Sequence, residues 1–166
     1  YLETVNTISK SVIDLTSIKR HSTSSFQFSQ LTMMNQGKIE SSSFNVGDDL
    51  IIKLKYSLKD ENLLKSNLQV KISINNSTQT EVLNLNNEVS GYIHNLNNKK
   101  GYILCKIPRI PLGEGRYSIN IESIINSGVA DVLNNVGSFE IIPGDYFGTG
   151  VANNTKANFY CISEWE

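Results

Sequence analysis

The residue types that most often carry catalysis or hold metals are few in this sequence and far apart. The chain has two histidines, His21 and His94, and neither has a Cys, Asp or Glu neighbour at the spacing of metal ligands. The sequence contains no Gly-x-Ser-x-Gly elbow and no recognisable paired-carboxylate motif. We therefore predict no catalytic residue, no metal site and no cofactor, and we interpret both histidines as ordinary surface residues.

Two glycine-rich turns are the candidates for phosphate chemistry. Gly113-Glu114-Gly115 and Gly148-Thr149-Gly150 lack the Lys-Ser/Thr that follows a nucleotide-binding loop, and no helical pattern comes after either. Tight turns in which glycine adopts a positive φ explain both. Any ATP chemistry associated with the protein is then expected outside this chain.

The composition predicts a globular chain without strong electrostatic partners. Its 166 residues fit one domain, and 39% hydrophobic with 19% charged residues suits a packed core. A net charge of −1 and a pI of about 6.2 argue against duplex nucleic acid or an anionic membrane surface as the main partner. No apolar run approaches the roughly 18 residues of a membrane span.

The two cysteines, Cys105 and Cys161, are too few for a disulfide framework. We interpret them as thiols in a reducing compartment; a single bridge between them is the alternative. The sequence begins at Tyr1 without a Met or a signal-like stretch, so we expect a fragment of a longer protein.

β structure is indicated by composition and by hydrophobic periodicity. Twenty Asn and twenty Ser favour turns over helix interiors. Apolar and polar residues alternate over 49–58, 68–74 and 117–121, which predicts strands with one buried and one exposed face. Shorter strands are expected at 24–32, 80–85, 89–95, 101–107 and 138–142. Turn signals between them favour an all-β fold, an antiparallel β-sandwich.

The first twenty residues follow a different pattern. Val5, Ile8, Val12 and Leu15 are spaced as on one side of a helix, although β-branched residues and Ser lower the helix propensity. We interpret residues 1–20 as a linker with a short helix, and residues 21–166 as the β-sandwich domain.

Three motifs together are more specific than any of these patterns. Residues 107–118 read I-P-R-I-P-L-G-E-G-R-Y-S, residues 131–136 read D-V-L-N-N-V, and residues 139–150 read F-E-I-I-P-G-D-Y-F-G-T-G. They resemble the C-terminal polysaccharide-binding domain of the ATPase subunit of O-antigen ABC transporters, the Wzt family. Trp165 near the end also fits this family, whereas Val136 replaces its usual small residue.

The resemblance implies a jelly-roll-like or immunoglobulin-like sandwich that binds the exported O-antigen-like glycan, at its non-reducing end, and takes part in lipopolysaccharide biosynthesis. It implies a location in the cytoplasm at the inner face of the bacterial inner membrane. It also implies an ATPase domain preceding residues 1–20, a permease subunit as partner through that domain, and a homodimer with an exchanged C-terminal strand. Residues 157–165 alternate and could form that strand; a strand that folds back on its own sandwich is the alternative.

A glycan site needs hydrogen-bonding side chains and an aromatic platform, which the exposed face of one sheet can supply. If strands 68–75, 116–125 and 136–142 share a sheet in an immunoglobulin-like order, six outward residues lie together. Tyr92 and His94 are two apart and could complete the site as platform and donor. The candidate carbohydrate-binding residues are therefore Gln69, Lys71, Ser73, Tyr92, His94, Ser118, Asn120 and Glu122.

The glycines and aromatics of the last motif have a structural interpretation. Asp145, Tyr146, Phe147, Gly148 and Gly150 are expected to fix the turn before the last strand, with a sugar platform as the alternative. Two other functions stay open for the chain: a structural dimerisation module of the transporter without glycan contact, and an extracellular adhesin or glycosidase-appended sandwich.

Overall fold

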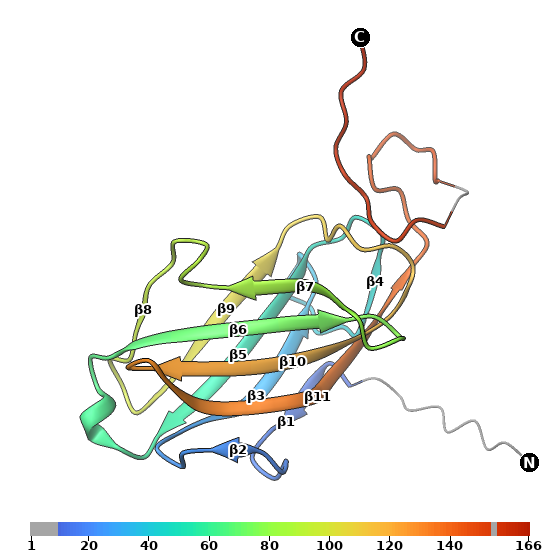
Figure 1. The fold of residues 1–166 in the computed structure, drawn as a ribbon. Coiled ribbons are helices and arrows are strands. Elements are labelled where there is room, and N and C mark those ends of the chain that lie inside the picture. Colours follow the sequence, from blue (N-terminus) through green and yellow to red (C-terminus); the bar gives the residue numbers. More distant parts are fainter. Residues whose placement is uncertain (1–9, 154–155) are drawn as a thin grey trace, which may run out of the picture.

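The computed structural model describes residues 10–153 and 156–166, in which two β-sheets pack face to face (Figure 1). In these residues sheet A has four antiparallel strands, in the order β1 (Val12–Asp14), β3 (Phe26–Met34), β5 (Leu50–Leu58) and β9 (Lys100–Ile107). Sheet B has the order β2 (His21–Ser22), β11 (Gly128–Ile142), β10 (Gly115–Ile125), β6 (Asn67–Asn75) and β7 (Glu81–Asn86).

Three short elements complete the described chain. Strand β4 (Ser43–Asn45) pairs parallel to β11, and β8 (His94–Asn95) pairs antiparallel to β6. A 3-10 helix, η1 (Glu61–Leu63), connects β5 to β6. Within the described residues, no helix is long and apolar enough to cross a membrane.

The predicted all-β antiparallel sandwich is confirmed, and its core follows the alternation in the sequence. On β5, Leu50, Ile52 and Leu54 are fully buried while Lys53 and Lys55 point away from the core. The inner residues of β6, β10 and β11 pack against them from the other layer. The burial of every second side chain therefore sets which face of each strand meets the opposite sheet.

The strand over 89–95 is wrong for most of its length, since only His94–Asn95 pairs with β6. The residues that precede His94 form a loop instead, which the Asn87 side chain fixes to β6. Asn87 accepts from the Val70 N–H at 2.6 Å and donates to the Leu68 carbonyl at 3.0 Å. Conversely, β11 is longer than expected and begins at Gly128. A register shift opposite Asn120, where Asn135 has φ 51°, lets this long strand continue.

The helix expected within residues 1–20 is wrong where the structure describes it. Residues Val12–Asp14 form β1, which pairs with β3, and Leu15 is fully buried in the core. β-Branched Val12 and Ile13 favour an extended strand. Leu15 packs into the core of the sandwich, so its apolar side chain does not require a helix. The described part of the expected linker thus lies on the sandwich, while Val5 and Ile8 lie outside the described residues.

The alternative in which residues 157–165 fold back as a strand on their own sandwich is wrong, whereas their exchange between the protomers of a homodimer stays a prediction. A single bridge joins Phe159 to Leu112, and beyond it the chain runs away from the two sheets (Figure 1). Ile162 and Trp165 are 70% and 92% exposed. Alternation without a neighbouring strand therefore leaves this segment irregular.

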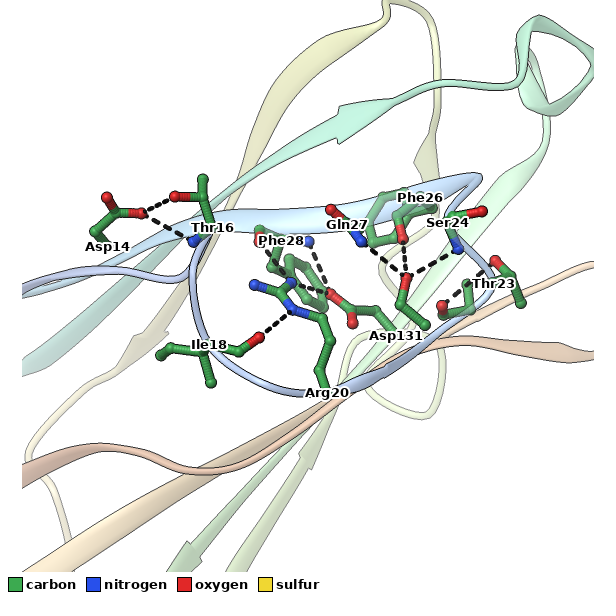
Figure 2. Close-up of polar contacts among 12 residues, drawn as sticks. Asp14, Thr16, Ile18, Arg20, Thr23, Ser24, Phe26, Gln27, Phe28 and Asp131 are labelled. Atoms are coloured by element: carbon green, nitrogen blue, oxygen red, sulfur yellow. Dashed lines mark hydrogen bonds and ion pairs between the residues drawn. The ribbon is translucent and has the colours of Figure 1, made fainter.

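A buried ion pair joins the two sheets near β2 (Figure 2). The Arg20 guanidinium, which follows the β1 segment, donates to the Asp131 carboxylate of β11 at 2.8 Å and to the Phe28 carbonyl of β3 at 2.8 Å. The same carboxylate oxygen accepts from the Phe28 N–H at 2.9 Å. Burial raises the pKa of the Asp131 carboxyl, against the opposing effects of the Phe28 N–H and Arg20.

We expect Asp131→Asn to lower the free energy of unfolding by about 3–5 kcal/mol, because it leaves the buried Arg20 guanidinium without its counter-charge. Urea denaturation measures the loss. The matched control is Glu61→Gln, which removes an exposed ion pair with Lys99 and should leave the urea midpoint unchanged. An unchanged midpoint for Asp131→Asn would contradict this role.

Candidate functional site

The structure brings six of the predicted site residues together on the outer face of sheet B. Strands β6 and β10 are neighbours, with Ser73 opposite Asn120 and Lys71 opposite Glu122. The six residues alternate with buried apolar residues on both strands and so point away from the core: Gln69, Lys71, Ser73, Ser118, Asn120 and Glu122. The predicted sharing of one sheet by β6, β10 and β11 is confirmed.

The polar groups of this face interact with one another. Lys71 Nζ lies 3.9 Å from a Glu122 carboxylate oxygen, so the two charges offset each other. Asn120 Oδ1 accepts from the Asn135 N–H at 2.8 Å, which holds this amide in place. The Ser118 hydroxyl is buried and is therefore not presented to a ligand. The face is polar, close to neutral and partly preorganised.

Two asparagines on the next strand extend the face, and the sequence analysis missed them. Asn84 and Asn86 of β7 lie opposite Ser73 and Lys71. Gln69 Nε2 donates to Asn86 Oδ1 at 3.4 Å, and Asn84 Nδ2 donates to Glu81 Oε1 at 3.0 Å. The alternation over 80–85 does contain the signal, but only the pairing of β7 with β6 shows which face these residues join.

Tyr92 and His94 do not lie on this face, so the eight predicted residues separate into two groups. His94 is opposite Leu68, a core residue of β6, and so faces inward. Its Nε2 hydrogen-bonds with the hydroxyl of the buried core residue Tyr56 at 3.0 Å, and its ring centroid lies 6.3 Å from that of Tyr92. The prediction of one shared platform is corrected by this strand pairing, since a residue opposite Leu68 cannot share a face with Gln69.

His94 is also not the surface residue that we expected. It is partly buried, and this burial lowers the pKa of its imidazole while burial raises the pKa of the Tyr56 hydroxyl. A neutral imidazole between two tyrosine rings has an obvious packing role. In the described residues, no group of three or more His, Cys, Asp and Glu side chains is placed to hold a metal ion.

The motif residues gather at one end of the sandwich, where they hold the C-terminal segment. The Gly113 N–H donates to the Asn158 carbonyl at 2.9 Å, and the Tyr160 N–H donates to the Pro111 carbonyl at 2.8 Å. A Cβ on Gly113 would lie 1.6 Å from the Ala157 carbonyl oxygen, so only glycine permits this crossing. The Tyr117 hydroxyl donates to the Gly113 carbonyl at 2.8 Å and fixes the turn.

The aromatic residues of the last motif stack within the same end. The Tyr146 and Tyr160 rings stack with centroids 5.0 Å apart, and the Arg109 guanidinium lies over Tyr146 at 4.9 Å. The Asp145 carboxylate accepts from the N–H groups of Gly148 and Gly150 at 2.9 and 2.6 Å, and these bonds, that from Gly150 foremost, lower the pKa of this carboxyl. These contacts favour the structural interpretation of the motif.

Comparison with known proteins agrees with this architecture. Residues 17–153 match the Wzt C-terminal domain family, and the chain belongs to that family. Among solved structures, one described as the crystal structure of the C-terminal domain of wzt is similar, with a TM-score of 0.67 and 9% identity over 89% of this chain and 87% of that chain. At this identity the likeness bears on the fold alone. None of the curated protein sequences matches the chain.

We expect His94 to make stability depend on pH. An unfolded chain takes up a proton near the ordinary histidine pKa of 6.5, whereas burial holds the pKa of folded His94 below it. This contribution to stability is present above about pH 6.5 and is lost as the pH falls through the lower, folded-state pKa.

The measurement is the free energy of unfolding as a function of pH. His94→Gln should remove this loss in acid. Tyr56→Phe should retain it, because burial and not the hydroxyl lowers the pKa. Identical pH profiles for the wild type and His94→Gln would refute the expectation.

Proposed function

We propose that this chain is the non-catalytic glycan-binding domain of a polysaccharide ABC transporter. It recognises the exported O-antigen-like glycan, at its non-reducing end, and couples recognition to export. Membership in the Wzt C-terminal domain family supports a role in such a transporter and a domain without catalysis of its own. The observation that carries the proposal is the amide-rich outer face of sheet B.

The chemistry of this face suits a neutral polyhydroxyl ligand. The amides of Gln69, Asn84 and Asn120 each keep a donor and an acceptor, which hydroxyl pairs on a sugar can meet at once. Asn86 offers its Nδ2 donor alone, because its Oδ1 already accepts from Gln69 Nε2 and from the Glu88 and Val89 N–H groups. Lys71 and Glu122 offset each other, so the face does not select a charged ligand. Each hydrogen bond adds only about 1 kcal/mol net, so affinity depends on several amides acting together.

The proposal includes the rest of the expected assembly. The domain acts as a homodimer, which adds avidity to a weak site. A preceding ATPase domain connects it to the transmembrane permease subunit, at the cytoplasmic face of the bacterial inner membrane.

A second candidate function is a structural dimerisation module that does not touch glycan. The observation that favours it is the C-terminal tail, in which Ile162 and Trp165 are exposed while Tyr160 is docked on Tyr146. Exposed large apolar side chains on an irregular segment are typical of a surface that meets another chain. Dimerisation through the tail is compatible with glycan binding, and separate experiments test the two.

For glycan binding, we expect the producing strain's own polysaccharide to shift backbone amide resonances of β6, β7 and β10, and an unrelated glycan to leave them unchanged. Asn120→Ala should weaken binding about fivefold, because it removes one amide that makes hydrogen bonds of about 1 kcal/mol. Gln30→Ala on sheet A is the matched control and should bind as the wild type does.

Shifts confined to other parts of the molecule, or none at millimolar sugar, would refute the assignment of this face. Thermal unfolding of both variants shows whether a loss of binding reflects a loss of fold.

For dimerisation, we expect Ile162→Ser with Trp165→Ser to convert a dimer into a monomer in sedimentation velocity, because the exposed apolar side chains of the tail are removed. The matched control is Ile39→Ser with Val89→Ser, which removes exposed apolar side chains elsewhere and should leave the dimer intact. A dimer that survives loss of both tail residues would exclude the tail as its contact.

A further inference from the structure

A cleft of about 510 Å³ opens between the two sheets, where β7 and β9 are the last strands of their layers. Figure 1 shows these two strands on the same side of the sandwich. Core residues from both layers form its floor: Ile52, Leu54, Val70, Ile72 and Ile103. The volume lies within the range of small-molecule sites, and the floor is apolar.

The loop at the mouth of the cleft is held in one conformation by side-chain hydrogen bonds. The Asn87 side chain accepts from the Val70 N–H at 2.6 Å and donates to the Leu68 and Tyr92 carbonyls at 3.0 and 3.1 Å, so one amide fixes the loop that precedes β8. The Ser90 hydroxyl donates to the Asn86 carbonyl at 2.7 Å and closes the same loop. Tyr92 is thereby placed at the mouth with 57% of its surface exposed.

The polar groups around the cleft are nearly uncharged. Lys106 is the one charged residue among its described lining residues, and its Nζ lies 3.1 Å from the Asp49 carboxylate. Asn84 and Asn86 are opposite Ser73 and Lys71, so their side chains join the outer face of sheet B and they border the cleft with their backbone. Strands β7 and β9 are edges in the described residues, and edge strands present N–H and C=O groups that lack a ladder partner.

We propose that this cleft binds one neutral sugar residue that carries a methyl-bearing substituent, such as the C6 methyl of a deoxy sugar or the methyl of an N-acetyl group. The ring face stacks on Tyr92, the substituent contacts the apolar floor, and the hydroxyls meet the backbone groups of the two edge strands. A purely apolar ligand would cover those backbone groups without satisfying them, which is costly. An anionic ligand finds one cation here, and that cation is already paired.

The choice of a sugar as the ligand rests on the proposed function, whereas the location of this site in the cleft does not. The polar face of sheet B would hold the hydrophilic stretch of a glycan, whereas the cleft selects one residue by its apolar part. The two positions can therefore succeed or fail separately.

Cys105 provides a direct reporter, since it lines the cleft and is partly buried. Cys161→Ser removes the exposed thiol and leaves Cys105 as the alkylation site. Burial raises the pKa of the Cys105 thiol, so alkylation by iodoacetamide is slow and is followed by mass spectrometry at mildly alkaline pH. A ligand in the cleft should slow it.

The probes are methyl glycosides in matched pairs, both members of a pair having the same absolute and anomeric configuration: fucoside against galactoside, rhamnoside against mannoside, and N-acetylglucosaminide against glucoside. We expect the member with the apolar substituent, in at least one pair, to slow alkylation about tenfold when it is about ten times above its Kd. Its hydroxylated partner should slow it far less.

Variants at two similarly exposed tyrosines separate the cleft from general effects. Tyr92→Ala should raise about fivefold the glycoside concentration that half-protects Cys105 from alkylation, as expected for one lost aromatic contact. Tyr102→Ala, which is 52% exposed on the outer face of sheet A and outside the cleft, should leave protection unchanged.

Equal protection within every pair, no protection at all, or protection by octanoate but by no glycoside would overturn the proposal; the last result would assign the cleft to an acyl chain. Amide shifts on β6 and β10 with the strain's polysaccharide, together with unprotected Cys105, would refute the cleft alone. Protected Cys105 with an unshifted outer face would refute the face and leave the cleft standing.

Discussion

The sandwich depends on one buried carboxylate that serves both of its layers. Asp131 on β11 of sheet B accepts from the backbone of Phe28 on β3 of sheet A and from the Arg20 guanidinium. Arg20 Nη2 and Asp131 Oδ1 are buried without a hydrogen-bond partner, so the pair brings little net stability. What it does provide is position: only one placement of β2, β3 and β11 leaves neither charge alone in the core.

Period-two alternation predicted the central strands because each has one buried face. This is why Gln69 and Asn120, which are far apart in the sequence, were correctly placed on one surface. Alternation does not say which strand is the neighbour. It therefore places His94 on the outer face of sheet B, although His94 is opposite the core residue Leu68. It also predicts a strand over 157–165, of which only the bridge between Phe159 and Leu112 forms in the described chain.

The terminal segments show a further limit of periodicity. The spacing of Val12 and Leu15 fits one side of a helix, and it fits equally well a strand that is followed by a buried side chain. Only the pairing of β1 with β3 decides between the helix and the strand. The motifs were more informative here than the periodicity. Gly113 and Tyr117 mark a place where another backbone must cross, and no count of apolar residues could show that the crossing segment is 157–158.

The open edges of β7 and β9 have a consequence for solubility. An unpaired strand edge is a template on which other chains can add, and natural sheets discourage this with charged side chains, lysine above all. Strand β9 carries Lys100 and Lys106, and β7 begins with exposed Glu81. The protein thus keeps the cleft between its two sheets accessible, while these charged side chains on the two edge strands oppose amyloid-like addition of further strands.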